Sequence, residues 1–551
     1  MAHRTTAARV ATADSTTTQA LVAVALGALV ALAILWLALA APALAADGVR
    51  LLPALDPLAD NWQDQPRVSG PVVVFCAMPD VGEQTVYACN AGAVSPAPWS
   101  MRALPGGALL MGEQMQPTVL TRGDVVRVVW TQVDGVGDLD LYLWEGSKTG
   151  VAAPGFPMKL VDHAYGRNAA DPSIGVAMVG GGSLVKAVDN VIVAWSDGPS
   201  INGTGGIAVV RWLNLSADTD TDGTPDYKDT EFDPKTAGTQ ADPAAAASQW
   251  QPDVGPKGVY WLDARTEDAA FLQTSIGRLN LEGATPTAGL FHSEAAGSGF
   301  DAECVRATAV GAAWLRIADY VSGAEPVANA VGGTMKVVTF LNDPSEFDVE
   351  GGAYALTEGH GGTTSGDPDV VFYTPSVGQT VGVCTAGNDI YDQYKAQKQP
   401  AISAAPGGYR VVWADPRDST GPSDEHMTIF QALVPTVTIS ANRVTRRLGD
   451  SVTFTAKVTP SFRGSPVKFQ TGARHSMTSG LGTSVWFTNL RTRKTKALGA
   501  GSKTTWTCTP TAKGTYYWRV SFGGGSRYVS KAGYGANHVP AVSRWLKIVV
   551  K

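Results

Sequence analysis

The chain has 551 residues, of which 44% are hydrophobic, and it contains 61 glycines and 33 prolines. This length predicts two to four domains, and the composition excludes a disordered chain and favours a turn-rich β protein. Charge divides the chain in two. From Pro435 onward there are 19 basic residues and one acidic residue, a net charge of +18, whereas the remainder carries −24. Two oppositely charged parts indicate two domains with different electrostatic roles.

Residues 1–45 have the pattern of an export signal. Basic residues precede an apolar run at 20–41, and Ala43-Leu44-Ala45 has the small-x-small pattern that signal peptidase recognises. We therefore predict a signal peptide. The alternative is an uncleaved anchor, because the apolar run is long enough to span a bilayer. Both interpretations place the rest of the chain outside the cytoplasm, in an extracellular protein that is secreted or associated with the cell envelope.

Residues 46–434 contain weakly similar repeats of about 45–55 residues, built from short β-runs and turns. The clearest copy begins at Gln399-Pro400, continues through the apolar run Tyr409–Trp413, and ends in a second strand at Met427–Leu433. Such a repeat is typical of a β-propeller with one four-stranded blade per repeat. We predict six or seven blades, without a choice between the two numbers, and expect a lead-in at 46–64 to close the ring by joining the last blade.

A tryptophan near the end of the second strand recurs at Trp130, Trp195, Trp261 and Trp413, and we expect it to pack between neighbouring blades. The Asp that often follows is expected to form an Asx-type turn. Because these Asp and Arg residues recur with the repeat, a structural role is favoured over catalysis. The pattern Gln-Pro-x-Ile … Val-Val-Trp-x-Asp-x-Arg resembles the repeats of TolB-like propellers in secreted and cell-surface microbial proteins. The resemblance implies the fold and leaves the function open.

The propeller pattern is interrupted by a predicted calcium-binding loop at 214–234. Carboxylates at alternate positions, a glycine at position 6 and further acids at positions 9 and 12 are the ligand pattern of a Ca²⁺ loop. The spacing resembles the thrombospondin type 3 calcium repeat, here in a single copy, and an acidic loop without an ion is the alternative. The predicted ligands are Asp218, Asp220, Asp222, Thr224, Asp226 and Asp229.

Residues 435–551 alternate apolar and polar side chains in seven short runs separated by turns, which predicts a β-sandwich. Segments such as Lys513–Val520 resemble the bacterial Ig-like repeats of actinobacterial secreted proteins. The seven expected strands are Thr436–Ser440, Val452–Val458, Val467–Gln470, Ser484–Asn489, Lys503–Thr509, Gly514–Phe522 and Trp545–Val550. The fold class expected for the whole chain is therefore all-β, a propeller followed by an Ig-like sandwich.

The basic C-terminal domain needs an acidic partner. Outside the cell, that partner would be an anionic wall polymer or glycan, bound in a salt-dependent way. The alternative is intramolecular docking on the acidic propeller of the same chain. Nucleic acid is not expected, because the compartment is wrong and no aromatic stacking platform is visible.

Five cysteines suit an oxidising compartment. Cys76 and Cys89 flank one predicted hairpin and are candidates for a disulfide across it. Cys304 and Cys384 are candidates for a second disulfide within the propeller. Cys508 is then left as a small buried side chain.

No nucleophile elbow, zinc-protease motif or phosphate-binding loop is present in the sequence. The pairings Glu358-Gly-His360 and Asp424-Glu425-His426 are interpreted as exposed turns. We therefore expect a non-catalytic binding or adhesion protein, not an enzyme. The alternative is a secreted carbohydrate-active enzyme with its site on the propeller axis. Acids and arginines converging on that axis would indicate the enzyme, and small apolar residues would indicate the binding module.

Overall fold

The computed structural model describes the chain from Val49 to Lys551 with gaps. In that described part every regular element is a β-strand, and no helix is long and apolar enough to cross a membrane. The predicted signal segment lies outside the described residues. The segments that the structure does not describe are 1–48, 53–57, 59–60, 79–81, 94–95, 103–108, 136, 163–166, 177–189, 200–205, 215–220, 222–237, 244–247, 265–273, 283–284, 294–299, 319–326, 332–333, 339–343, 359–368, 375–378, 384–396, 417–426, 460–465, 477–482, 495, 499–500, 523–524, 529–534 and 539–540.

The first four blades are antiparallel meanders of four strands each. Tight turns join the first two strands of a blade, and Gly70 (φ 58°) and Gly123 (φ 57°) supply left-handed conformations there. In blade order the strands are β2 (Trp62–Ser69), β3 (Val72–Met78), β4 (Thr85–Asn90) and β5 (Trp99–Ser100); β6 (Gln114–Arg122), β7 (Val125–Val133), β8 (Leu139–Ser147) and β9 (Met158–Val161); β10 (Asn168–Val176), β11 (Asn190–Gly198), β12 (Ile207–Asn214) and β13 (Thr239–Gln240); and β14 (Gln249–Gly255), β15 (Gly258–Asp263), β16 (Ser275–Asn280) and β17 (Thr287–His292).

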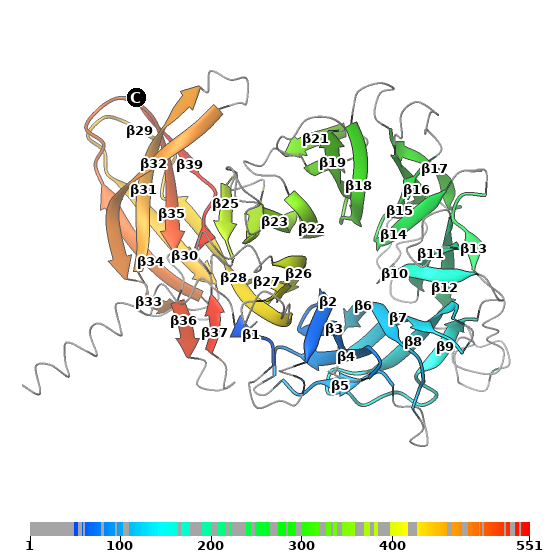
Figure 1. The fold of residues 1–551 in the computed structure, drawn as a ribbon. Coiled ribbons are helices and arrows are strands. Elements are labelled where there is room, and N and C mark those ends of the chain that lie inside the picture. Colours follow the sequence, from blue (N-terminus) through cyan, green and yellow to red (C-terminus); the bar gives the residue numbers. More distant parts are fainter. Residues whose placement is uncertain are drawn as a thin grey trace, which may run out of the picture. The chain divides into compact units, whose positions relative to one another are not determined.

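Three further blades follow, so the described residues form seven and not six. Their strands are β18 (Phe300–Ala307), β19 (Gly311–Ala318), β20 (Val327–Val331) and β21 (Thr334–Val338); β22 (Pro344–Glu350), β23 (Ala353–Glu358), β24 (Asp369–Thr374) and β25 (Gln379–Gly382); and β26 (Lys398–Ala405), β27 (Gly408–Asp415) and β28 (Thr428–Ala441), joined by β1 (Val49–Arg50). The first strands of successive blades contact one another in the order β2, β6, β10, β14, β18, β22, β26, and β26 contacts β2 again (Figure 1). The blades therefore form a closed ring, and the β-propeller prediction is confirmed.

The ring is closed by the N-terminal strand, as the lead-in at 46–64 predicted. Val49 pairs with Gln431 and Arg50 with Phe430, so β1 becomes the fourth strand of blade 7. The next residue continues the ladder, because Leu51 N donates to Ile429 O at 2.8 Å. Leu51 and Leu52 are buried with residues of blades 1 and 7. Chain segments from the two ends of the propeller are thus held together by main-chain hydrogen bonds and a shared apolar cluster.

The second strand of each blade is a nearly continuous apolar run, because a neighbouring blade covers each of its faces. Trp130, Trp195, Trp261 and Trp413 are 0% exposed, and Trp314 of β19 is buried in the same way. These indoles pack against the preceding blade; Trp261, for example, shares a cluster with Ile192 and Ala194 of β11. The predicted wedge between blades is therefore confirmed. Phe75 occupies the same position in blade 1, and Leu356, which packs against Ala313 and Leu315 of the preceding blade, occupies it in blade 6.

In blades 4 and 7, the Asp two residues after the tryptophan bonds to the indole ring. Trp261 Nε1 donates to Asp263 Oδ2 at 2.9 Å, and Trp413 Nε1 donates to Asp415 Oδ2 at 2.9 Å. In blade 2, Gln132 replaces the Asp and accepts from Trp130 Nε1 at 3.2 Å. The Asx-turn expectation therefore missed the main partner of this carboxylate, which fixes the orientation of the wedge. Its role is structural, as expected.

Beyond the propeller, β28 continues across Val434-Pro435 as the first strand of the C-terminal domain and pairs there with β30 (Val452–Thr459). Two sheets there enclose a core that includes Phe454, Phe469, Trp518 and Val520. The two-sheet sandwich and the position of its strands agree with the prediction, and the Ig-like subtype stays a proposal. Its strands are β29 (Thr445–Arg446), β30 (Val452–Thr459), β31 (Pro466–Ser476), β32 (Thr483–Lys494), β33 (Lys496–Leu498), β34 (Gly501–Cys508), β35 (Gly514–Phe522), β36 (Gly525–Tyr528), β37 (Gly535–His538), β38 (Ala541–Val542) and β39 (Leu546–Val550).

The candidate disulfide between Cys76 and Cys89 is wrong. Both side chains are buried. Cys76 is opposite Val86 in the β3–β4 ladder and Cys89 is opposite Val73, and the two side chains enter different apolar clusters. They lie on opposite faces of the blade, so they cannot reach each other. Cys304 forms no disulfide with a described residue, and its candidate partner Cys384 lies outside the described residues.

Candidate functional site on the propeller axis

A β-bulge interrupts the first strand of each blade, where these strands surround the axis. The register shifts in β2, β6, β10, β14, β18, β22 and β26 all fall where the repeat begins. Six of the bulges contain a non-glycine residue in the left-handed region, with φ between 48° and 54°; these residues are Gln65, Gln116, Asp171, Gln251, Cys304 and Gln399. Backbone strain repeated at one position of a ring requires stabilising contacts, and hydrogen bonds between blades provide them.

In blades 7, 1 and 2, the Gln of the Gln-Pro motif ties its blade to the next. Gln399 Oε1 accepts from Gln65 N at 2.6 Å, and Gln65 Oε1 accepts from Gln116 N at 2.6 Å. Gln116 Oε1 in turn accepts from Asp171 N at 2.9 Å. In blade 6, Glu346 takes this role and accepts from Gln399 N. We call these side chains the bulge residues. Their recurrence has a structural cause, which explains why the motif defines the repeat.

A second set of ties lies two residues further along the strands. Ser173 Oγ accepts from Val254 N at 3.1 Å and links blades 3 and 4. Asp253 Oδ2 accepts from Ala307 N at 2.6 Å and links blades 4 and 5. Asp348 Oδ2 accepts from Ile402 N at 2.8 Å and links blades 6 and 7. We call this position the tie position, and in blades 3, 4 and 6 its side chain accepts a hydrogen bond from the next blade.

Blades 1 and 5 carry arginines at the tie position, Arg67 and Arg306. A guanidinium has only donors, so neither residue can make the tie. Each folds back on its own strand: Arg67 Nη1 donates to Pro66 O at 3.1 Å, and Arg306 Nη1 donates to Val305 O at 2.9 Å. Arg306 Nε lies 3.9 Å from Asp348 Oδ1, and both side chains remain 22% exposed. The axis therefore contains guanidinium groups beside carboxylates, in a partly open position.

Burial and mutual charge shift the pKa values of these groups. Burial lowers the pKa of Arg67, and the positive charge of Arg306 lowers it further. The nearby acidic groups raise this pKa but do not outweigh the lowering. Burial alone would lower the pKa of Arg306, but Cys304, Asp253, Asp348 and Asp171 outweigh it and the pKa is raised. Five charged side chains from five blades therefore act on one another: Arg67, Asp171, Asp253, Arg306 and Asp348. We call this group the axial cluster.

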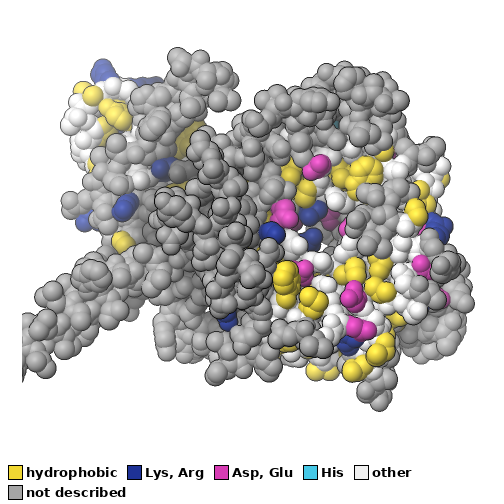
Figure 2. Space-filling model, viewed as in Figure 1, with side chains coloured by type: hydrophobic (Ala, Val, Ile, Leu, Met, Phe, Trp, Pro, Cys, Tyr) yellow, Lys and Arg dark blue, Asp and Glu magenta, His cyan; other side chains and the backbone are white. Residues whose placement is uncertain are grey.

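Two carboxyl groups of the axial cluster, those of Asp171 and Asp348, have raised pKa values and hold their protons more tightly than free aspartate does. Burial raises the pKa of Asp171 to about 6, although the two arginines oppose the shift. Burial also raises the pKa of Asp348, again against Arg306. Gln116 Nε2 donates to Asp171 Oδ1 at 3.1 Å and fixes the orientation of that carboxyl group. Figure 2 shows basic and acidic side chains together in the hollow that the inner strands surround.

The sequence analysis set acids and arginines on the axis as the sign of an enzyme, and a small, apolar axis as the sign of a binding module. The structure shows acids and arginines on the axis, which is the sign set for an enzyme. Sequence reasoning missed the arginines because it interpreted charged residues of the repeat as structural and found too many acids to choose among. One signal was available: Arg67 follows Gln65-Pro66 directly, where the equivalent repeats have Thr118, Ser173, Asp253 and Ala401.

The six predicted calcium ligands lie outside the described residues, as do His360 and Asp424-Glu425-His426. Glu358 ends β23, where it pairs with Asp369 and Pro344. Within the part of the chain that is described, no group of three or more His, Cys, Asp and Glu side chains is arranged to hold a metal ion. The calcium-site prediction therefore stays a prediction, because its ligands are outside the part of the chain that the structure describes.

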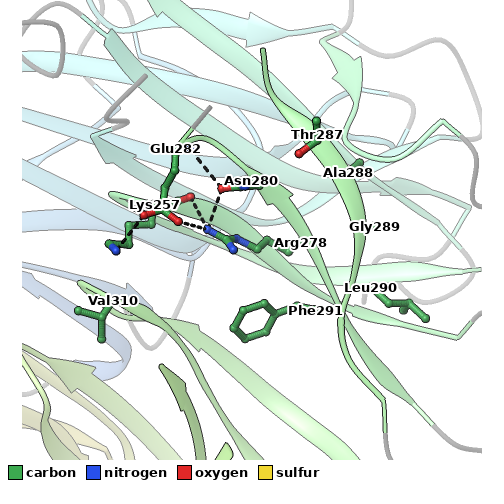
Figure 3. Close-up of a pocket in the computed structure, with 10 residues that line it drawn as sticks. All are labelled: Lys257, Arg278, Asn280, Glu282, Thr287, Ala288, Gly289, Leu290, Phe291 and Val310. Carbon is green, nitrogen blue, oxygen red and sulfur yellow. Dashed lines mark hydrogen bonds and ion pairs between the residues drawn. The ribbon is translucent and has the colours of Figure 1, made fainter. Parts of the chain in front are cut away.

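A second depression of about 450 Å³ lies over β16 and β17, away from the inner strands (Figure 3). Its charged side chains are paired with one another. Arg278 Nη2 donates to Asn280 Oδ1 at 2.8 Å and to Glu282 Oε2 at 3.0 Å, and Lys257 Nζ lies 2.9 Å from Glu282 Oε1. The guanidinium of Arg278 also stacks between Tyr260 and Phe291, 5.5 Å from each ring centre. These contacts explain the cluster as a local support of blade 4, and the axis remains the candidate site.

Comparison with known proteins agrees with the fold. No family model matches the sequence, and no curated protein matches it. Among solved structures, a puromycin-hydrolyzing peptidase from Mycobacterium tuberculosis is 12% identical, with a TM-score of 0.43 over 75% of this chain and 61% of the peptidase. The β-propeller domain of the Trilobed protease from Pyrococcus furiosus is 9% identical, with a TM-score of 0.38 over 64% of this chain and 91% of that domain.

The fold is a seven-bladed β-propeller. Another similar structure is an exo-β-1,3-galactanase from Phanerochaete chrysosporium, 11% identical with a TM-score of 0.28 over 74% of this chain and 94% of the galactanase. The chain spans about three fifths of the peptidases, and at these identities the similarity is one of fold and assigns no reaction. Peptidases and glycosidases among the neighbours nevertheless contradict the prediction that this chain is not an enzyme. That prediction is corrected.

Proposed function

We propose that the protein is a carbohydrate-active enzyme that hydrolyses a glycan at the axial cluster. The observation that carries the proposal is the convergence of carboxyl and guanidinium groups from five blades on the axis. Glycoside hydrolysis in most families needs two carboxyl groups, one that donates a proton to the leaving oxygen and one that stays ionised. The cluster supplies several carboxyl groups in unequal environments, which is how proteins divide acid and base roles.

Asp171 is the proposed proton donor. Its pKa of about 6 keeps about half of the groups protonated at pH 6, where ordinary aspartate is almost fully ionised. The bond from Gln116 Nε2 holds the carboxyl group in place during proton transfer. Asp348 is the proposed second carboxylate: main-chain donors Val349 N and Ile402 N bind its oxygens at 2.9 and 2.8 Å, and Arg306 faces it. These contacts oppose the rise that burial causes in the pKa of Asp348, and an ionised Asp348 would stabilise positive charge on the sugar ring.

The proposal predicts release of reducing ends from polysaccharides, measured with neutral and uronic-acid polymers between pH 4 and pH 8. The donor must be protonated, so the rate should fall as pH rises above about 6, where Asp171 ionises. On the acid side the rate should fall when the second carboxylate becomes protonated, giving a bell-shaped profile. A protein that releases no reducing ends from any of these polymers would contradict the proposal, and so would a rate that rises through pH 8.

We also propose that the 214–234 loop binds Ca²⁺ through the six residues named above, on the basis of their spacing. Asp222→Ala should then abolish the calcium-dependent protection of this loop from proteolysis, measured by limited digestion with and without chelator. Asp124→Ala, which changes a fully exposed side chain in another turn, is the control and should keep the protection. Unchanged protection in Asp222→Ala would refute the site.

The other expectations from the sequence remain proposals that rest on charge and on the N-terminal pattern. We propose an extracellular or envelope-associated protein whose domain at 435–551 contacts an anionic wall polymer or glycan. Docking of that domain on the acidic propeller is the alternative. The net charge of +18 on one domain and −24 on the rest supports both.

A further inference from the structure

We infer that Arg67 and Arg306 recognise the carboxylate of an acidic sugar, so that the substrate is a uronic-acid-containing glycan. This inference rests on the proposed function and names its substrate class. It begins from the tie position, where Ser173, Asp253 and Asp348 each accept a main-chain N–H from the next blade. Arginine cannot accept, so blades 1 and 5 cannot make the hydrogen bond that blades 3, 4 and 6 make at this position. Departures of this kind are expected at functional positions.

Neighbouring residues replace the missing ties. Blade 1 is bonded to blade 2 further along the strand, where Ser69 Oγ accepts from Thr121 N at 2.9 Å. In blade 6, Val349 N occupies the position that a tie from blade 5 would bind, and it donates to Asp348 Oδ1 at 2.9 Å. Because these bonds satisfy the backbone, the two arginines are not needed to hold the blades together.

Most N–H donors of the two guanidinium groups are available to bind a ligand. Within the described residues, each arginine makes one hydrogen bond, to the carbonyl of the residue before it. The 3.9 Å between Arg306 Nε and Asp348 Oδ1 is too long for a second one. The two positive charges also act on each other, and an anion bound between them would relieve that repulsion. A planar carboxylate fits this role best, since it accepts two parallel N–H bonds from a guanidinium.

The rest of the axial cluster selects the kind of anion. Asp171 and Asp253 lie within the field of Arg306 and would repel a phosphate or sulfate that carries more than one charge. Their oxygens can accept hydrogen bonds from hydroxyl groups instead. A ligand with one carboxylate and several hydroxyls can bind both the arginines and the aspartates of the cluster. A uronic acid has this composition. A neutral sugar would leave both arginines without an anion.

The test is calorimetric binding of digalacturonate to the full chain, with digalactose as the neutral comparison. Arg67→Gln and Arg306→Gln remove the charge and keep an amide that can donate to the same carbonyl. Arg443→Gln, at an exposed position in the C-terminal domain, is the matched control. We expect digalacturonate to bind at least about tenfold more tightly than digalactose, and each axial variant to lose about 10- to 100-fold in affinity. The control should bind as the wild type does.

Binding is measured without turnover, so its outcomes separate the two proposals. Equal affinity for the acidic and neutral disaccharides, or digalacturonate affinity that survives in both axial variants, would overturn the inference even if a neutral glycan is hydrolysed. Arginine-dependent binding of digalacturonate without hydrolysis of any polymer would support the ligand assignment and contradict the proposed reaction. Thermal unfolding of each variant should match that of the wild type, and Arg67→Lys, which restores charge without the planar fork, should recover only part of the affinity.

Discussion

Replacing Asp171 by asparagine is expected to lower the rate of glycan hydrolysis by about 100-fold or more, because a positioned general acid contributes that much. The substitution suits the backbone. Asp171 has φ 48°, and asparagine is among the few residues that tolerate this left-handed conformation. Asparagine also keeps an oxygen that can accept from Gln116 Nε2, so the bulge should be preserved. The variant therefore removes the acidic proton of the side chain at position 171 and leaves the geometry of the bulge unchanged.

The measurement is the initial rate on the polymer that the wild-type protein degrades, with Asp124→Asn as the control. The Asp124 side chain is fully exposed, in the turn between β6 and β7, and its pairing with Lys148 is a distant 3.7 Å. This control should keep the full rate. Equal rates for wild type and Asp171→Asn would contradict the assignment of the proton donor.

The second large effect is expected on stability. Replacing Trp261 by alanine should lower the free energy of unfolding of the propeller by about 3–5 kcal/mol, the usual cost of removing a buried aromatic side chain. Trp261 is 0% exposed and packs between blades 3 and 4. Its loss also removes the donor 2.9 Å from the buried Asp263 Oδ2. The surrounding blades can collapse only partly into the space, because both are held by their own hydrogen-bonded ladders.

Chemical unfolding monitored by fluorescence and circular dichroism tests this expectation. Trp545→Ala is the control, because Trp545 is 45% exposed and its loss should change stability by less than about 1 kcal/mol. A midpoint for Trp261→Ala that equals those of the control and the wild type would show that the indole is not a structural wedge.

The ring could be predicted from the sequence because its periodic residues have structural causes. The Gln of Gln-Pro ties neighbouring blades, the tryptophan fills the space between them, and the Asp two residues later accepts the indole N–H. Each of these roles needs a particular residue type at a fixed place in every blade. The lead-in strand was also foreseeable, since a propeller must close its first blade on its last.

The number of blades could not be predicted, because blades 5 and 6 lack these markers. Blade 5 has Cys304-Val305 in place of Gln-Pro, and blade 6 has Leu356 at the position of the tryptophan. The main-chain ladders and bulges persist there with other side chains. A propeller blade tolerates such changes because hydrogen bonds between main-chain atoms define it.

The axial cluster could not be predicted for a related reason. Arg306 follows Cys304-Val305, where no repeat was visible, so nothing in the sequence aligned it with Arg67. Only the register of the strands shows that both occupy the tie position, and only the closed ring brings them near Asp253 and Asp348. Residues separated by more than two hundred positions in the chain meet there because seven first strands share one axis (Figure 1).

The most direct measurement is a crystal structure of the full chain soaked with digalacturonate. The account predicts electron density for a sugar on the propeller axis, with its carboxylate within hydrogen-bonding distance of Arg67 and Arg306 and a hydroxyl group or glycosidic oxygen beside Asp171. Density at the depression lined by Arg278 and Glu282, with an axis that holds only solvent at saturating ligand, would contradict it.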